Sequence, residues 1–499
     1  MLNEELSNNV QKRTFWERLI IKKFEAPIVI IFALLASLFV TFVIAQGGYQ
    51  IGIIIICALI GLPIAYAAVV YPKFGIISLI VISFFINYSS RFLPEPTPIG
   101  LLMDLWTYLL LLGLFVKMKN DRQWGYFNNP ITYFLLIWLA YNMLEVINPV
   151  SPTILEWVFT VRTVAFIMLM YFVFLYHIRT KEFIKLLIKI WLALDVIGAI
   201  SGLQQEFFGL LPFEREWLYR FPERFKLLFI AGHLRKWSIF SDPVVFAYNM
   251  VAAALLCIAL TFGPVKFSKK VILGCLAALY LFAMLYTGTR ASYVILPAGI
   301  LMLFILKLNK QIFIFSIISG LCLLVLIKIP TSNATLARFQ SAFKPSKDAS
   351  FEERAKNQEA IKPYILSHPI GGGLGSVGVW GQRFAPNSYL AKFPPDSGYV
   401  RVAVELGWIG LLLYCIFNFV IMYKGIQYYY TIRNPELKTY CLGMILFIFA
   451  FDVGNYPQQA LVQYPSNILF FLAMAILNIT MRLDIAERKL KPEIKGNKI

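Results

Sequence analysis

Long apolar runs separated by short polar segments fill most of this chain. A helix needs about 20 apolar residues to cross the hydrocarbon core of a bilayer, and a helix satisfies all its backbone hydrogen bonds within that core. About fourteen runs approach this length, although the third is short enough to be re-entrant. We therefore predict an all-α polytopic membrane helix bundle of about 12–14 transmembrane helices. The runs lie near 27–45, 51–70, 74–88, 99–116, 130–147, 158–176, 184–208, 243–262, 271–288, 292–306, 311–329, 399–422, 439–456 and 464–481.

Lysine and arginine mark one side of the predicted membrane. The segments that face inward when the N-terminus is cytoplasmic are basic, whereas the short opposite loops at 46–50, 147–157 and 457–463 contain neither residue type. This asymmetry is the positive-inside pattern, so both termini are expected in the cytoplasm. The predicted organisation is a cytoplasmic N-terminal segment (1–26), a transmembrane body (27–481) and a cytoplasmic basic tail (482–499).

Two outward segments are much longer than connectors need to be. Residues 209–242 mix aromatic and charged side chains, which is typical of helices lying on the membrane surface. Residues 330–398 are expected to form a functional loop, with a helix ending near Ser367 and a glycine-rich turn after it. Both segments are basic although they face outward. Either long loops tolerate these charges, or the cations bind an anion.

Composition and charge narrow the class of protein. Of the 499 residues, 59% are hydrophobic and 15% are charged, which excludes a soluble or disordered chain. The net charge of +19 arises largely from residues that flank apolar runs, so no nucleic-acid partner is predicted. The three histidines lie far apart and the six cysteines fall inside apolar runs, so we expect no metal site and no cofactor.

Charged residues inside predicted spans are costly, and they are usually functional or paired. Arg162, Arg290 and Arg401 lie near outer ends, where guanidinium groups suit a membrane-anchored phosphate. Arg401 and Glu405 are four residues apart on one helix, so a simple ion pair is the alternative interpretation. The in-span charges are Asp104, Glu145, Arg162, Asp195, Glu206, Arg290, Arg401, Glu405 and Asp452.

The segment 371–378 contains a GxGxxG pattern. No strand precedes it and no βαβ unit surrounds it, so a dinucleotide site is excluded. Two interpretations stay open: a turn whose backbone approaches a ligand, and a plain helix stop after His368 and Pro369.

An ordered series of short motifs resembles the O-antigen ligase/polymerase superfamily, best over residues 233–415. The series begins with Arg235-x-x-Ser238-Ile239-Phe240 and Thr289-Arg290-Ala291-Ser292, and the loop arginines Arg338 and Arg354 follow. It continues with Pro369-Ile370-Gly371-Gly372-Gly373-Leu374-Gly375, Asp396-Ser397-Gly398-Tyr399 and Glu405-Leu406-Gly407-Trp408-Ile409-Gly410.

The resemblance implies an inverting, metal-independent membrane glycosyltransferase of surface polysaccharide or lipopolysaccharide synthesis. Such enzymes take glycan from an undecaprenyl-diphosphate-linked oligosaccharide on the periplasmic face of the bacterial inner membrane and pass it to a glycan or lipid-linked acceptor. By position, the diphosphate would lie on Arg290, Arg235, Arg354 and Arg401, with Gly373, Gly375 and Tyr399 supporting the site.

Ligases of the family carry a histidine near the end of the long loop, and this chain has Asp396 in that neighbourhood. Asp396 and Glu405 are therefore the candidate bases, and the change favours the polymerase branch. Aromatic residues of the outer loops would stack on sugar rings or anchor the loops at the interface: Trp380, Phe384, Tyr389, Phe393 and Tyr399.

A transporter or flippase of lipid-linked sugars is the main alternative, because it too places charges within spans. Transporters often contain two related halves, and no internal repeat is visible here.

Overall fold

A computed structural model describes residues 59–94, 97–230, 232–308, 310–332, 334–343, 349–394 and 396–496, with positions 31, 34–35, 37–38 and 41–42. The chain divides into two units, Met1–Ala67 and Ala68–Ile499. The described residues of the first unit are helical. The predicted span 27–45 lies largely outside the described residues.

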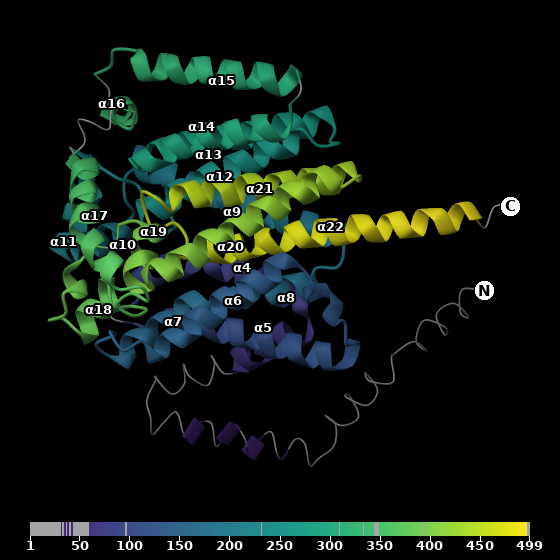
Figure 1. The fold of residues 1–499 in the computed structure, drawn as a ribbon, viewed down its shortest axis with the longest axis horizontal. Helices are drawn as coiled ribbons and strands as arrows, with labels where there is room; N and C mark the ends of the chain where they lie inside the picture. The colour runs from purple at the N-terminus through teal and green to yellow at the C-terminus, as the bar shows by residue number, and fades with distance from the viewer. Residues whose placement is uncertain are drawn as a thin grey trace. The chain divides into compact units, whose positions relative to one another are not determined.

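The second unit is a helical membrane bundle (Figure 1). Nine of its described helices are long and apolar enough to span a bilayer, and two shorter apolar helices (Arg290–Leu306 and Ile312–Lys328) and the 27-residue α9 accompany them. The predicted all-α polytopic class is confirmed. The helices of the bundle are α4 (Pro72–Ser89), α5 (Gly100–Asp121), α6 (Pro130–Leu144), α7 (Ile154–Met168), α8 (Met170–His177), α9 (Lys181–Phe207), α12 (Pro243–Thr261), α13 (Phe267–Leu285), α14 (Arg290–Leu306), α15 (Lys310–Lys328), α20 (Gly407–Thr431), α21 (Pro435–Gly454) and α22 (Ser466–Gly496).

Local sequence explains where many of these helices begin. Proline occupies the first position of α4, α6, α12 and α21, where its missing amide hydrogen is not needed. The side chains of Asn129, Thr153, Thr180, Asp242 and Asn434 accept backbone hydrogen bonds from the first turns of α6, α7, α9, α12 and α21.

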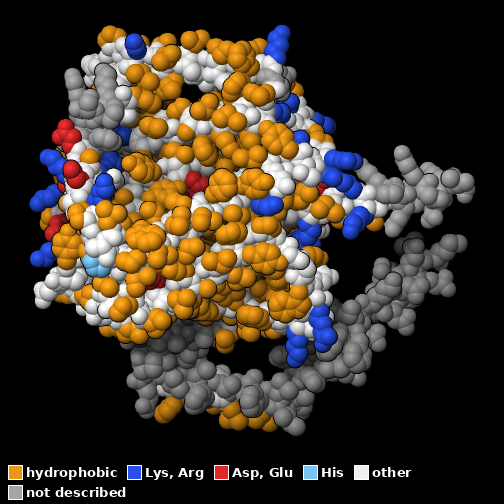
Figure 2. Space-filling view, in the orientation of Figure 1, with side chains coloured by type: hydrophobic (Ala, Val, Ile, Leu, Met, Phe, Trp, Pro, Cys, Tyr) orange, Lys and Arg blue, Asp and Glu red, His pale blue; other side chains and the backbone are white. Residues whose placement is uncertain are grey.

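Burial separates central from peripheral helices. In each of α12, α21 and α22, 78% of the apolar window is buried, against 22% in α13. The outer helices expose apolar side chains instead, which form the broad hydrophobic surface in Figure 2. A broad apolar surface around a bundle of membrane-length helices is typical of contact with lipid.

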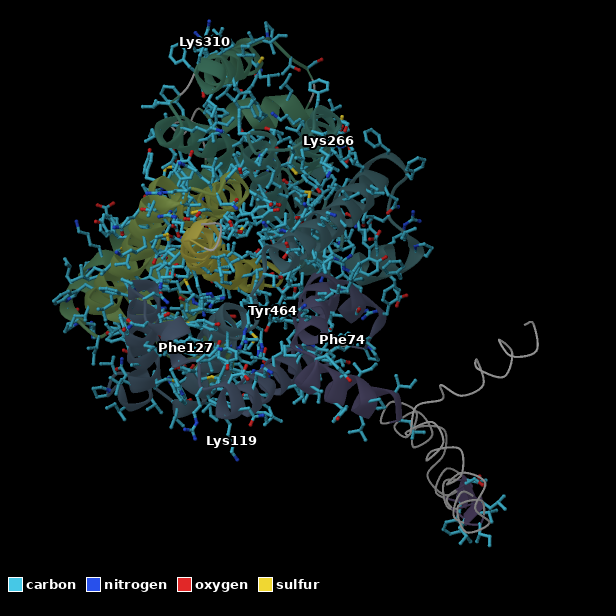
Figure 3. All side chains as sticks on the ribbon, turned by 90° about the vertical axis from the view of Figure 1, so that its right-hand side faces the viewer. Phe74, Lys119, Phe127, Lys266, Lys310 and Tyr464 are labelled. Carbon is cyan, nitrogen blue, oxygen red and sulfur yellow. The ribbon has the colours of Figure 1, made fainter. Side chains whose placement is uncertain are left out.

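The two ends of the bundle differ in charge. Lysine and arginine gather at the end toward which α22 extends (Figure 2), and Lys119, Lys266 and Lys310 lie around that end in Figure 3. The opposite end, which we call the loop end, carries the long connections. Its elements are η1 (Ser90–Phe92), α10 (Pro212–Tyr219), α11 (Pro222–Leu228), α16 (Ala334–Ser341), α17 (Ala349–Ser367), α18 (Gly378–Phe384), η5 (Leu390–Lys392), α19 (Gly398–Glu405) and the antiparallel pair β1 (Phe229–Ile230) and β2 (His233–Leu234).

The prediction of one continuous span over 399–422 is wrong. The chain breaks into α19 and α20 at Gly407, whose φ is +70°. A Cβ atom on Gly407 would lie 2.0 Å from the carbonyl oxygen of Pro369, which belongs to the long loop. The break therefore results from a tertiary contact with the loop, which the apolar pattern does not reveal. The predicted span 158–176 lies within one membrane-spanning helical segment, Ile154–His177, in which α7 and α8 meet at Leu169.

We expect Gly407→Ala to destabilise the protein, because a side chain there combines a left-handed backbone with a backbone clash. The left-handed conformation alone costs about 1–2 kcal/mol. Thermal unfolding of the purified protein in detergent should show a clearly lower midpoint. Gly125→Ala is the control, since a Cβ atom at Gly125 meets nothing within 4 Å. Equal midpoints for the two variants would contradict the contact.

Candidate functional site

The connection between α13 and α14 forms a tight turn at the loop end. Gly288 has a φ of +59°, and a Cβ atom there would lie 2.9 Å from Nε of Arg338 and 3.4 Å from Cγ of Arg235. The hydroxyl of Thr287 donates to the carbonyl oxygen of Met284 at 2.7 Å, which fixes the start of the turn. Glycine is thus required where two arginine side chains approach the backbone.

Arg235 reaches this turn from the segment after β2. Its Nε donates to the carbonyl oxygen of Thr287 at 3.0 Å, and its Nη2 donates to the hydroxyl of Thr289 at 2.9 Å. The backbone amide of Lys236 donates to the carbonyl oxygen of Tyr286, so the main chains of the two segments are also joined. These acceptors are uncharged and leave the positive charge of Arg235 in place.

Arg338 and Arg290 complete a cluster with Arg235. Nε of Arg338, from α16, donates to the carbonyl oxygen of Gly288 at 2.8 Å, and Arg290 is the first residue of α14. Burial, together with the nearby charges of Arg338 and Arg290, lowers the pKa of Arg235 to about 10 although Asp242 opposes this change. We call Arg235, Arg290 and Arg338 the guanidinium cluster. The predicted residues Arg235 and Arg290 are therefore brought together.

An apolar groove of about 780 Å³ begins beside the guanidinium cluster. Leu285, Tyr293 and Phe339 line it near the turn, and Phe262 lines it at the other end of α12. The rings of Tyr293 and Phe339 lie 4.9 Å apart, and Phe339 directly follows Arg338. The groove runs along α13, α14 and α15 and reaches the last turn of α12, so one apolar surface extends from the hydrocarbon depth to the cluster.

Arg354 and Asp396 form a second group. Nη1 of Arg354, from α17, donates to the carbonyl oxygen of Pro457 at 2.9 Å. Asp396 is exposed, but partial desolvation raises the pKa of its carboxyl group, while Arg354 lowers that pKa and Glu353 raises it. A carboxylate with a raised pKa beside a guanidinium is suited to accept a proton.

Arg401 and Glu405 form the ion pair that their spacing allows. Nε of Arg401 lies 3.0 Å from Oε1 of Glu405, and its Nη1 donates to Gln459 at 2.7 Å. The Glu405 carboxylate is 3% exposed and also accepts backbone hydrogen bonds from Gly375 and Val377. A cavity of about 110 Å³ lies beside the pair and extends between α6, α7, α20 and α22.

The backbone amides of the glycine-rich turn bind other parts of the protein. The amides of Gly372 and Gly373 donate to the carbonyl oxygens of Val404 and Glu405, each at 2.9 Å. A Cβ atom on Gly373 would meet Ser151, and one on Gly375 would meet Thr160, so these glycines permit close packing against α7 and the preceding loop. The turn docks the long loop onto α7 and α19.

Residues 275–415 match the family model Wzy_C, described as O-Antigen ligase. This segment of the chain is similar to the O-antigen ligase family. The predicted resemblance is thereby confirmed, and the match supports an O-antigen-ligase-type membrane enzyme. Among curated proteins, none matches this sequence.

The matched segment 275–415 contains most of the predicted site residues. Arg290, Arg354, Asp396, Arg401, Glu405, Gly373, Gly375 and Tyr399 lie within it, and Arg235 lies outside it. Tyr399 points into the bundle, because its hydroxyl donates to the carbonyl oxygen of Asp452 at 3.1 Å. The rings of Trp380 and Phe384 pack against Phe159 of α7 in tilted contacts, with centroids 4.8 and 5.0 Å from that of Phe159.

Sequence reasoning missed or undervalued several residues around this segment. Arg338 was expected among the loop arginines but was not selected as a ligand. Arg91, only 2% exposed, follows an apolar run and looks like an ordinary flanking cation. Lys236 lies 3.2 Å from Glu206, which explains one of the in-span charges. Glu156 is fully buried, and among the described residues neither of its carboxylate oxygens has a hydrogen-bond partner.

Proposed function

We propose that this protein is a glycosyltransferase that polymerises or transfers glycan from an undecaprenyl-diphosphate-linked oligosaccharide on the periplasmic face of the bacterial inner membrane. One observation carries the proposal: the guanidinium cluster lies at the head of an apolar groove. A donor with a diphosphate head and a long hydrocarbon tail matches this combination of charge and apolar surface.

The donor would bind in two parts. Its polyprenyl tail lies in the groove along α13–α15, where each buried methylene contributes about 0.8 kcal/mol. Its diphosphate lies on Arg235, Arg290 and Arg338, whose planar groups donate paired hydrogen bonds to phosphate oxygens. Arg354 contributes from the other part of the long loop.

The chemistry follows from the charge that develops during transfer. When the anomeric carbon leaves the diphosphate, negative charge grows on the leaving oxygens, and the positioned guanidinium groups stabilise it. An acceptor hydroxyl attacks from the opposite face, so the configuration at that carbon inverts. Asp396 takes the hydroxyl proton as general base.

Asp396 is a better base than Glu405 in this arrangement. The Glu405 carboxylate already binds Arg401 and the amides of Gly375 and Val377, so its lone pairs are engaged. We propose that Glu405 and Arg401 instead hold the long loop in place.

The proposed orientation places the loop end in the periplasm and both termini in the cytoplasm, because the opposite end is basic.

Purified protein incubated with an undecaprenyl-diphosphate oligosaccharide tests the proposal. Longer lipid-linked glycans formed without a second acceptor indicate a polymerase, and products that require a lipid-A-core acceptor indicate a ligase. Arg290→Ala should reduce either product by at least about a hundredfold, as loss of a transition-state donor does. Expression and membrane insertion should remain normal.

Arg383→Ala is the matched control for Arg290→Ala. Arg383 is exposed in the long loop and stacks on Trp380 and Phe384. It should keep activity near that of the wild type. Full activity of Arg290→Ala, or an equal loss in both variants, would remove Arg290 from the site.

Gly320→Phe tests the groove directly. Gly320 lines the groove, and a Cβ atom there meets nothing within 4 Å, so a phenyl group fits and occupies space meant for the tail. Displacing two buried methylenes should raise the KM for a long-chain donor about tenfold. The KM for a donor with a short prenyl chain should not change. An equal rise for both donors would argue against a tail in the groove.

The pH dependence of kcat/KM tests Asp396 as the base. The base must be unprotonated, so activity falls as pH drops through its pKa, which is raised above the ordinary aspartate value. Arg354→Gln removes a positive charge and should move this acid limb to higher pH. Glu353→Gln removes a negative charge and should move it to lower pH.

Glu352→Gln is the control for these pH profiles. Glu352 is exposed and lies on α17 next to Glu353 and Arg354 in sequence, but it is not among the groups that change the pKa of Asp396. Its acid limb should coincide with that of the wild type. Identical limbs in all variants would exclude Asp396 as the titrating base.

A further inference from the structure

We infer that Arg91 is a positioning residue that fixes the direction of Arg235 toward the donor diphosphate. This inference rests on the proposed function, in which Arg235 binds that diphosphate. Arg91 lies in η1, far from Arg235 in sequence, and is only 2% exposed. A buried cation in a membrane protein is costly, so its contacts indicate what it is kept for.

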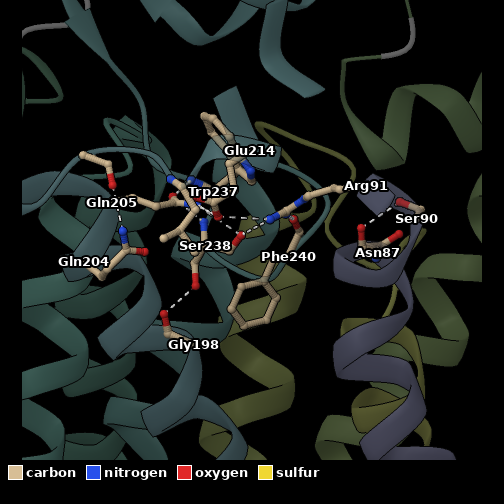
Figure 4. A network of polar contacts seen from close by, with 12 residues as sticks. Asn87, Ser90, Arg91, Gly198, Gln204, Gln205, Glu214, Trp237, Ser238 and Phe240 are labelled. Carbon is tan, nitrogen blue, oxygen red and sulfur yellow. Dashed lines mark hydrogen bonds and ion pairs between the residues drawn. The ribbon is translucent and has the colours of Figure 1, made fainter. Parts of the chain in front are cut away.

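Both terminal nitrogens of Arg91 donate to the backbone of one turn. Nη1 donates to the carbonyl oxygen of Ser238 at 2.7 Å, and Nη2 donates to that of Phe240 at 2.5 Å (Figure 4). The guanidinium carbon lies 5.4 and 5.9 Å from the ring centroids of Trp217 and Trp237. The side chain of Arg91 therefore holds the turn 237–240 by binding the main chain of that turn.

Helix α9 also binds this turn, and α10 supports the side chain through which it does so. Gln205 of α9 accepts hydrogen bonds from the amides of Trp237 and Ser238. Its Nε2 donates to Glu214 of α10, whose Oε1 lies 3.6 Å from Nη1 of Arg91 (Figure 4). Glu214 is fully buried, so the charges of Arg91 and Glu214 depend on each other.

The backbone of the turn requires such support. Ser238 has a φ of +54°, a conformation that residues other than glycine rarely adopt. Arg235 precedes this residue by three positions, and Asp242, which caps α12, follows it by four. The grip of Arg91 on residues 238 and 240 thus sets where Arg235 enters the guanidinium cluster.

A purely structural role would lower stability alone, so the test separates stability from donor binding. Four variants of the full chain are compared with the wild type: Arg91→Met, Arg91→Lys, Arg91→Met with Glu214→Gln, and Arg482→Met. The measurements are the thermal midpoint, the KM for donor and for acceptor, and kcat, with the undecaprenyl-diphosphate oligosaccharide as donor.

Arg482 is the matched control at the other end of the bundle. Its Nη1 and Nη2 donate to the carbonyl oxygens of Leu175 and Ile178 at 2.9 and 2.7 Å, and it stacks on Tyr126. Arg482→Met removes the same kind of contacts without touching the turn 237–240. It should lower the thermal midpoint and leave the KM for the donor unchanged.

We expect Arg91→Met to raise the KM for the donor about ten- to a hundredfold, because small misplacements of a binding group have effects of this size. The KM for the acceptor should not change. In the double variant, Glu214→Gln removes the carboxylate that Arg91→Met leaves without its cation. The thermal midpoint should therefore be restored, but the KM for the donor should stay raised. Arg91→Lys, which retains one donor, should lie between Arg91→Met and the wild type.

Two results would overturn the inference. One is a wild-type KM for the donor in the folded double variant, and the other is an equal rise in Arg482→Met. If Arg91→Met does not fold, the double variant and Arg91→Lys carry the test. An unchanged KM in Arg235→Met would instead overturn the diphosphate site of the proposed function, and with it the premise of this inference.

Discussion

Guanidinium groups held by backbone carbonyl oxygens organise the loop end of this membrane bundle. Arg235 and Arg338 donate to adjacent carbonyl oxygens of the turn between α13 and α14, and Arg354 donates to the connection between α21 and α22. Arg91 donates to two carbonyl oxygens of the turn 237–240. A carbonyl dipole replaces part of the lost hydration of the cation without cancelling its charge. Arg235 is therefore both anchored and available to an anion, which a carboxylate partner would not permit.

Arg401 illustrates the opposite use of the same residue type. Its charge is neutralised by Glu405 at 3.0 Å, and that carboxylate also accepts amides from the glycine-rich turn. Breaking such a buried pair leaves one charge uncompensated, so the pair ties the long loop to α19. Asp104 and Arg162, 3.1 Å apart, are paired in the same sense within the bundle. Arg401 and Arg162 are thus neutralised by carboxylates, whereas Arg235 donates to uncharged acceptors and keeps its charge.

The hydrophobic pattern predicted most of the fold because lipid imposes one demand on every span. Where tertiary contact competes with this demand, the pattern fails: Gly407 lies in an apolar run, and only its proximity to Pro369 explains the break. The approach of Arg235 to Arg290 could not come from periodicity either, because residues 55 positions apart meet through the turn around Gly288. Motif resemblance supplied that pairing. Arg91 was missed because an arginine at the end of an apolar run ordinarily reaches to the membrane surface.

The long loop connects donor binding to the candidate base. Its first helix, α16, contacts α14 and supplies Arg338 to the guanidinium cluster, while α17 contacts α19 and brings Arg354 beside Asp396. One loop thus touches both groups that the proposed reaction needs. If a diphosphate draws Arg338 and Arg354 toward one ligand, the approach of α17 also fixes the surroundings of Asp396. Contacts of the donor with this loop and the charge beside the candidate base therefore depend on the same segment, α16–α17.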